Sequence, residues 1–165
     1  MDKLYAPWRS DYVTGTVHKE KREKLKNDCV FCNAFQENND EKYFILKRYK
    51  HCIVMLNAYP YNAGHLLILP IEHKGELHDL SVDARNELMD IINLSINALT
   101  KVLKPQGFNV GLNLGIAGGG GIPSHLHFHI LPRWSGDTNY LTTIGEVKTV
   151  SSDLFKIYKD LKKEF

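Results

Sequence analysis

The sequence has 165 residues, of which 43% are hydrophobic and 24% are charged, a composition typical of one globular domain with a complete core. The formal net charge of +2 is too small to indicate a nucleic-acid partner, and no run approaches the ~18 apolar residues of a membrane span. Three cysteines without an apolar signal-peptide core predict thiols in the reducing cytoplasm.

Residues 1–28 mix aromatic and charged side chains, and we expect them to form an N-terminal arm. The remainder, residues 29–165, is predicted to be a single domain with a helical extension at its C-terminus. No internal repeat is visible, and the only low-complexity segment is a run of four glycines at residues 118–121.

Three short strands are expected in the first half of this domain. Apolar runs at residues 43–46 and 52–56 flank Arg48-Tyr49-Lys50, which predicts a hairpin. Residues 57–64 are rich in turn-forming types and lead into a third apolar run at residues 65–70.

A long helix is predicted from Ser81, a good N-cap, to Lys104, where Pro105 and Gly107 follow. Strands are expected at residues 108–114 and 125–134, and a C-terminal helix at residues 151–165. The predicted fold class is therefore α+β, with an antiparallel sheet of about five strands, one long helix and a C-terminal helix.

Three histidines alternate along the last expected strand: His125, His127 and His129. Because successive side chains of a strand point to opposite faces, the three imidazoles would share one face. One interpretation is a half-buried strand whose polar face happens to be histidine. The others are a three-histidine metal site, or a histidine nucleophile between two imidazoles that handle charge and protons.

The glycine run joins two strands and ends just before the histidines. Consecutive glycines allow backbone N–H groups to approach an anion, so the run indicates either a plain flexible loop or a phosphate-binding loop. It is not a nucleotide P-loop, because no Lys-Ser/Thr pair follows it.

Cys29 and Cys32 form a Cys-x-x-Cys pair with two interpretations. They are either two small core residues or one half of a zinc site that needs two more ligands. Cys52, on an apolar run, is expected to be a core thiol. We expect the four remaining histidines outside the triad and His73 to be surface or packing residues: His18, His51, His65 and His78.

Taken together, residues 125–133 and the glycine loop before them resemble the signature of the histidine triad (HIT) superfamily. The match covers about residues 29–134. It includes the Cys-x-x-Cys pair, Asn57 ahead of the 64–70 strand, His73 after that strand, and Asn113 before the glycine loop. Residues 132–139 and 4–9 are similar to the diadenosine polyphosphate phosphorylase branch.

The resemblance implies a HIT-like fold and a role for each matching residue. His127 would be the nucleophile that attacks the α-phosphorus of a nucleotide, and His129 would contact the phosphoryl oxygens and help the leaving group depart. Nucleotide and phosphate contacts are implied for Asn57, Asn113, Gly119, Gly120, Gly121 and His129. Structural zinc is implied for Cys29, Cys32, His73 and His125.

One departure from the family pattern lies just before the triad. Many members have a glutamine and a serine there that contact the phosphates, whereas this chain has Gly121 and Ile122. Ser124 is a candidate substitute for phosphate binding. Arg133 and residues 134–139 are expected to line the same site and to add a cationic contact for a second anion.

The expected function is a cytoplasmic nucleotidyl-transferring enzyme that converts diadenosine tetraphosphate and phosphate into ATP and ADP. The alternatives are a hydrolase of dinucleoside polyphosphates or adenosine phosphoramidates, and a purine-nucleotide-binding module with little turnover. A zinc hydrolase that uses all three strand histidines is disfavoured, because it leaves the Cys-x-x-Cys pair without a role. Mg²⁺ on the substrate and a homodimer are expected, with neither nucleic acid nor membrane as partner.

Overall fold

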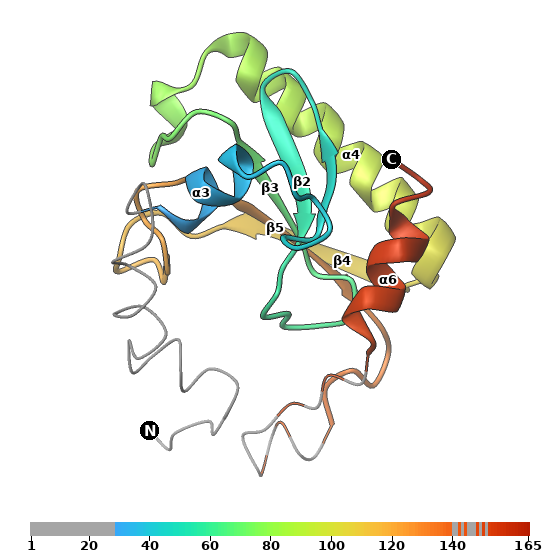
Figure 1. The fold of residues 1–165 in the computed structure, drawn as a ribbon. Helices are drawn as coiled ribbons and strands as arrows, with labels where there is room; N and C mark the ends of the chain where they lie inside the picture. Colours follow the sequence, from blue (N-terminus) through green and yellow to red (C-terminus); the bar gives the residue numbers. More distant parts are fainter. Residues whose placement is uncertain (1–28, 140–141, 143, 145–147, 149, 151) are drawn as a thin grey trace, which may run out of the picture.

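The computed structural model describes residues 29–139, 142, 144, 148, 150 and 152–165, so the predicted arm at residues 1–28 lies outside the described residues. A five-stranded antiparallel sheet forms the centre of the molecule, with the order β1-β2-β3-β5-β4 (Figure 1). Its strands are β1 Ile45–Arg48, β2 Cys52–Leu56, β3 Leu66–Pro70, β4 Gly107–Leu112 and β5 Phe128–Arg133. The predicted α+β class and antiparallel sheet are confirmed.

The described helices are α3 Val30–Gln36, the 3₁₀ turn η1 Leu77–Asp79, α4 Val82–Leu103 and α6 Leu154–Leu161. As predicted, Ser81 caps the long helix α4: its hydroxyl accepts a hydrogen bond from the N–H of Ala84 at 3.1 Å. The helix ends at Lys104, whose backbone is left-handed with φ 49°. The sequence did not predict α3, which has no side-chain cap at its N-terminus.

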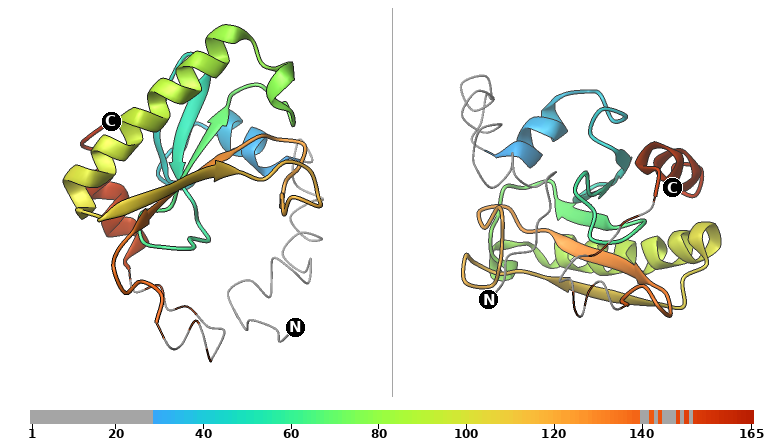
Figure 2. Two further views of the ribbon diagram at one scale, coloured as in Figure 1. Left: turned by 180° about the vertical axis from the view of Figure 1, so that it is seen from behind. Right: turned by 90° about the horizontal axis from the view of Figure 1, so that it is seen from below.

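The two faces of the sheet carry different clusters of apolar side chains, and α4 and α3 cover opposite faces (Figure 2). The side chains that pack toward α4 and α6 include Val54, Leu56, Leu66, Ile68 and Ile130. Those that pack toward α3 include Ile45, Ile53, Met55, Leu67 and Leu69. Because β2 and β3 are buried on both faces, they read as continuous apolar runs in the sequence.

Helix α6 attaches the C-terminal segment to the β1 edge of the sheet. The hydroxyl of Tyr158 donates to the carbonyl of Ile45 at 3.2 Å, and the ammonium of Lys162 donates to the carbonyl of Leu46 at 2.6 Å. Asp153 caps the helix by accepting from the N–H of Lys156 at 3.0 Å. The helix is shorter than the predicted 151–165, and residue 151 is outside the described residues.

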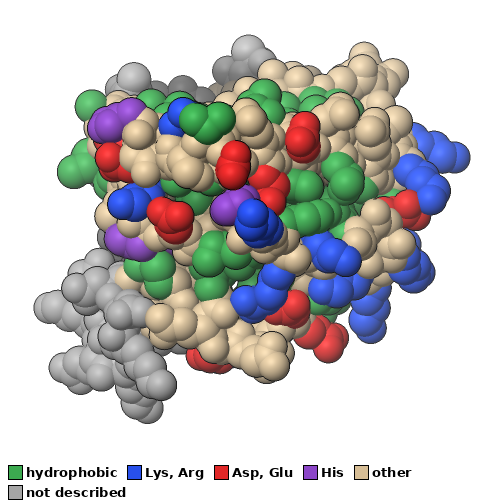
Figure 3. All heavy atoms as spheres, turned by 90° about the horizontal axis from the view of Figure 1, so that it is seen from above, with side chains coloured by type: hydrophobic (Ala, Val, Ile, Leu, Met, Phe, Trp, Pro, Cys, Tyr) green, Lys and Arg blue, Asp and Glu red, His purple; other side chains and the backbone are tan. Residues whose placement is uncertain are grey.

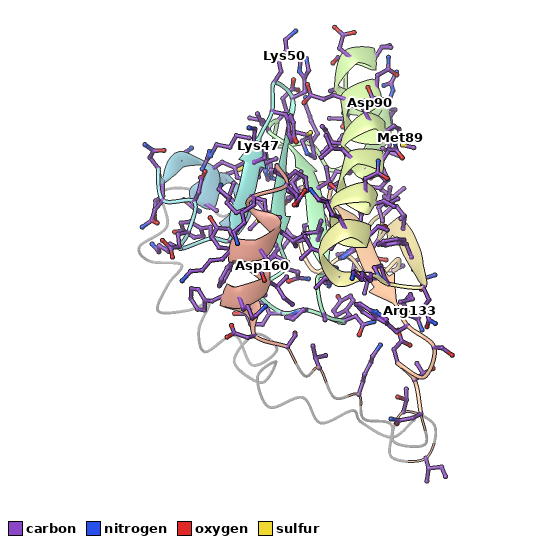
Figure 4. All side chains as sticks on the ribbon, turned by 90° about the vertical axis from the view of Figure 1, so that its right-hand side faces the viewer. Lys47, Lys50, Met89, Asp90, Arg133 and Asp160 are labelled. Atoms are coloured by element: carbon purple, nitrogen blue, oxygen red, sulfur yellow. The ribbon has the colours of Figure 1, made fainter. Side chains whose placement is uncertain are left out.

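The surface away from the sheet carries both signs of charge and some exposed apolar side chains. Met89, 59% exposed, and Asp90 lie on the outer face of α4 (Figure 4). Lysine and arginine side chains gather at one end of the face in Figure 3, with acidic side chains among them. Within the described part of the chain, no helix has both the length and the apolar composition of a membrane span.

Candidate active site

The triad histidines do not lie on one regular strand. Only His129 belongs to β5, whereas His125 and His127 precede it. The backbone of this segment bonds to residues outside the sheet: the N–H of His125 donates to the carbonyl of Ile122 at 3.2 Å. The predicted strand over residues 125–134 therefore begins too early, because backbone bonds to loops replace the sheet ladder. All three imidazoles are nevertheless buried, with His125 0% and His127 and His129 each 8% exposed.

A close backbone contact brings the loop after β3 to this segment. The N–H of Leu126 donates to the carbonyl of Lys74 at 2.7 Å. A Cβ atom on Gly75 would lie 2.7 Å from the carbonyl oxygen of Pro123, so only glycine fits at this contact. This contact holds His73, at the start of the loop, beside His125.

Four ligand-type side chains meet at this contact: Cys29, Cys32, His73 and His125, with their ligand atoms all within 4.8 Å of one another. The Nδ1 atom of His125 lies 3.3 Å from the Sγ of Cys29 and 3.5 Å from the Sγ of Cys32. It also lies 3.3 Å from the Nδ1 of His73. Three separate segments of the chain thus contribute to one cluster.

These separations fit a tetrahedral zinc ion. With usual Zn–S and Zn–N bond lengths, a tetrahedron places nitrogen and sulfur ligands about 3.5 Å apart and two nitrogens about 3.3 Å apart. The Nε2–H of His125 donates to the carbonyl of Pro70 at 2.9 Å, which fixes the proton there and leaves Nδ1 as the ligand atom. The donor set and the hydrogen bonding both suit zinc.

The middle histidine presents one free nitrogen. The Nδ1–H of His127 donates to the backbone carbonyl of His125 at 2.8 Å. In a neutral imidazole the proton on Nδ1 leaves a lone pair on Nε2. The ring of Phe31 lies 5.3 Å from that of His127 and covers its α3 side. The carbonyl of His125 therefore orients the His127 ring so that Nε2 is the nitrogen with the lone pair.

A chain of hydrogen bonds fixes the proton of His129 in the complementary position. The backbone N–H of Tyr61 donates to the Nδ1 of His65 at 3.2 Å. His65 therefore carries its proton on Nε2, which donates to the Nδ1 of His129 at 2.9 Å. The proton of neutral His129 is left on Nε2, a buried atom without a partner among the described residues. His129 thus has an N–H without a hydrogen-bond partner among the described residues, on a ring whose centre lies 5.0 Å from that of His127.

Both rings of this relay are neutral at pH 7. Burial and, to a smaller extent, nearby imidazoles lower the pKa of His65 to about 3 and that of His129 to about 4. Because the charged forms are disfavoured, the proton positions set by the Tyr61 amide persist across the neutral range.

The glycine loop is coiled on itself. The N–H of Gly119 donates to the carbonyl of Ile116 at 3.0 Å, and that of Gly120 donates to the carbonyl of Gly115 at 3.1 Å. Gly119 has φ 86°, which favours glycine. Two of the three amides expected to bind phosphate, those of Gly119 and Gly120, therefore donate within the loop. The third expected donor, the N–H of Gly121, makes no such bond within the described loop.

A family model for the HIT domain matches residues 37–136, which include β1 to β5 and the triad. The chain belongs to the HIT domain family. It is 36% identical over 150 residues to a protein of Mycobacterium tuberculosis (strain CDC 1551 / Oshkosh) named AP-4-A phosphorylase, covering 91% of this chain and 77% of the relative. It is 28% identical to the adenosine 5'-monophosphoramidase of Schizosaccharomyces pombe, covering 64% of this chain and 74% of the relative.

The fold of this HIT domain is also that of solved structures. A zinc-bound histidine triad family protein from Mycobacterium smegmatis superposes with a TM-score of 0.67 at 21% identity. The superposition covers 82% of this chain and 91% of the other. The shared fold includes the antiparallel sheet that carries the triad.

The other expected site residues of the HIT domain surround the triad. Asn57 is half-buried, and its side-chain amide lies 3.3 Å from the Nδ1 of His65. Asn113 is half-buried just beyond the end of β4, and Ser124 is exposed at the entrance to the triad segment.

Arg133, the last residue of β5, forms an ion pair with Asp137. Its Nε and one terminal nitrogen donate to the carboxylate of Asp137 at 2.6 and 2.8 Å, and its other terminal nitrogen donates to the side chain of Asn109. It lies near the C-terminal end of α4 (Figure 4), four strand residues or about 13 Å from His129. The expected cationic contact for a second anion stays a prediction, and the guanidinium that would make it is paired with Asp137.

His65, which was expected to be a surface or packing residue, is packed inside the molecule and contacts the triad. It is completely buried at the start of β3, and its partner His129 lies 64 positions later in the chain. The sequence does contain a signal for this role: His65 begins an otherwise apolar run. A histidine buried with such a run requires a hydrogen-bond partner, and the triad offers one.

Proposed function

We propose that the protein is a nucleotidyl-transferring enzyme that cleaves dinucleoside polyphosphates, converting diadenosine tetraphosphate and phosphate into ATP and ADP. One observation carries this proposal: the Nε2 lone pair of His127 adjoins the unpartnered Nε2–H of His129. A nucleophile and a proton donor are thereby held on neighbouring rings whose centres are 5.0 Å apart. The mycobacterial relative named AP-4-A phosphorylase supports the choice of substrate.

In the first step, the Nε2 of His127 attacks the α-phosphorus of the substrate. The new N–P bond forms as the P–O bond to the leaving nucleoside polyphosphate breaks, and the departing oxygen takes the bonding electrons. The Nε2–H of His129 donates a hydrogen bond to the oxygen on which negative charge develops. The product of this step is a nucleotidyl-His127 intermediate and free ATP.

In the second step, an oxygen of inorganic phosphate attacks the same phosphorus. The N–P bond breaks, His127 recovers its lone pair on Nε2, and ADP leaves. Attack by water instead would release AMP and define a hydrolase, which is the alternative activity. We propose Asn57 for the ribose hydroxyls, and Asn113, Gly121 and Ser124 for the phosphates, with Gly119 and Gly120 shaping the loop.

We also propose that the cluster of Cys29, Cys32, His73 and His125 binds structural zinc. The distances between the four ligand atoms and the hydrogen bond from the Nε2 of His125 to Pro70 support zinc, and a solved relative is described as zinc-bound. Zinc would supply a cross-link between α3, the loop after β3 and the triad segment. His125 would then act on the chemistry only through the carbonyl that orients His127.

Three further features complete the proposal. Mg²⁺ would accompany the polyphosphate as part of the substrate. A homodimer is supported by β4, which pairs only with β5 in the described part of the chain and exposes Val110. The cytoplasm is supported by the three cysteines, which are all free thiols.

The choice of acceptor is tested directly by product analysis. We expect diadenosine tetraphosphate to give ATP and ADP in equal amounts in millimolar phosphate, with little AMP. Anion-exchange chromatography of reactions with and without phosphate measures both products. If AMP and ATP form at the same rate in both reactions, the protein is a hydrolase and phosphorolysis is wrong. If neither reaction proceeds, the enzyme proposal fails.

Replacing His65 tests the relay that fixes the proton of His129. We expect His65→Leu to lower kcat by roughly 10- to 100-fold with little change in KM, as for other residues that orient a functional imidazole. His65→Gln keeps an N–H that can donate to the Nδ1 of His129, and should retain more activity. A pH–rate profile separates this role from a structural one, because losing the hydrogen bond from His65, which favours neutral His129, should raise the pKa of His129. Equal losses in both variants with an unchanged profile would contradict it.

A further inference from the structure

One face of β4 beside the triad has no bulky side chain. Gly107, Asn109 and Gly111 alternate along the strand, so they share one face, and Asn113 directly follows the strand at the next alternate position. Gly111 is the cross-strand partner of His129 on β5. Directly opposed residues of an antiparallel pair point to the same side, with Cβ atoms about 5 Å apart. This face of β4 therefore continues the sheet surface on which the His129 imidazole stands.

The His129 imidazole has neighbouring side chains from β3, from the loop before it and from the triad segment. His65 binds its Nδ1 atom, and the ring of Tyr61 stacks on it at 5.9 Å with an interplanar angle of 20°. Its partner on β3 is Leu67, a buried side chain. On the β4 side, a Cβ atom on Gly111 would meet nothing within 4 Å, and Gly111 is exposed. The missing side chain leaves space beside the ring.

The residues on either side of Gly111 are polar, and its cross-strand partner His129 carries an unsatisfied donor. His129 is only 8% exposed, and its buried Nε2 atom has no hydrogen-bond partner among the described residues. Asn109 and Asn113 lie two residues to either side of Gly111, about 7 Å away along the strand. The side-chain oxygen of Asn109 accepts from Arg133, which orients its amide group. Amide groups on both sides of an open strip suit an anionic chain.

We infer that the strip Asn109-Gly111-Asn113 is the floor of a subsite for the leaving nucleoside polyphosphate. This inference rests on the proposed function and adds the place of the second half of the substrate. The transferred nucleotide becomes attached to His127, whose α3 side is covered by Phe31. The leaving half departs on the side of the proton donor His129, and Gly111 provides the adjacent open surface.

A side chain added at Gly111 should weaken the binding of diadenosine tetraphosphate but not that of AMP. Gly111 has an ordinary backbone conformation, so Gly111→Val fits the strand, and valine favours strand structure. In a His127→Asn background, which prevents turnover, we expect this change to weaken diadenosine tetraphosphate binding roughly tenfold or more. AMP binding should not change, because AMP has no leaving half. Titration calorimetry measures both affinities.

Gly107→Val is the matched control. It adds the same side chain to the same face of β4, also with nothing within 4 Å, but beside Arg133 at the far end of the strand. Both affinities should be unchanged. The inference is overturned if Gly111→Val leaves diadenosine tetraphosphate affinity intact, or weakens AMP equally. The binding measurements do not require turnover. If the wild-type protein failed to cleave diadenosine tetraphosphate, the proposed function would be refuted, and the two affinities would still test the subsite.

Discussion

Replacing His127 by asparagine is expected to lower turnover of diadenosine tetraphosphate by about 10⁴-fold or more, because it removes the only group that forms the covalent intermediate. The asparagine amide can still donate to the carbonyl of His125, so the local backbone should be preserved. AMP affinity is therefore expected to persist. Steady-state kinetics and calorimetry on the same preparation measure the two properties.

The intermediate provides a second measurement on this variant. A substrate labelled at the α-phosphorus should leave an acid-labile, base-stable label on the wild-type protein, as expected for a phosphoramidate. His127→Asn should take up no label. His78→Asn, at an exposed histidine on η1, is the matched control and should be labelled like the wild type. Labelling of His127→Asn would assign the nucleophile to another residue.

Much of the scaffold could be predicted because local patterns and packing agree. The apolar runs of β2 and β3 are short and continuous, which is typical of strands buried on both faces. Helix α4 combines a serine cap with one apolar stripe, and its predicted start is confirmed by the Ser81 hydrogen bond. These elements depend on interactions within a few residues, so the sequence specifies them directly.

The triad segment shows where local reasoning fails. Alternation of histidine with apolar residues predicts a strand, yet only His129 lies in β5. His125 is instead held by the carbonyls of Ile122 and Pro70, and the next residue is bound to Lys74. These partners are the end of β3 and two loops, and the loops meet where Gly75 contacts Pro123. A periodic pattern cannot report contacts between segments 50 residues apart.

Hydrogen bonds that form only in the folded chain explain the remaining differences. The relay from Tyr61 through His65 to His129 joins two strands distant in sequence, and only the antiparallel pairing of β3 with β5 brings them together. Likewise, the glycine loop was expected to present free amides, but its positive φ at Gly119 lets it fold back on its own carbonyls. Both outcomes depend on three-dimensional closure rather than on residue type.

Removing zinc is expected to lower thermal stability more than it lowers the rate per folded molecule. A ligand present at a hundred times its Kd stabilises the folded state by about 2.7 kcal/mol. For a domain of this size, that corresponds to roughly 5 to 11 °C in Tm. The four ligands come from three segments, so chelation should loosen α3 and the loop after β3 while β5 keeps His129 in place. Calorimetric scans with and without chelator measure the shift.

Cysteine variants separate zinc loss from a general effect of the chelator. About one zinc per chain should copurify with the wild type, and Cys32→Ser should lose it, because a hydroxyl is a much poorer zinc ligand than a thiolate. The Tm of Cys32→Ser should then not respond to chelator. Cys52 is a buried thiol outside the cluster, so Cys52→Ala should keep its zinc even though the lost packing lowers its stability. Metal-replete protein without zinc, or a chelator response that survives in Cys32→Ser, would contradict a structural ion at these four side chains.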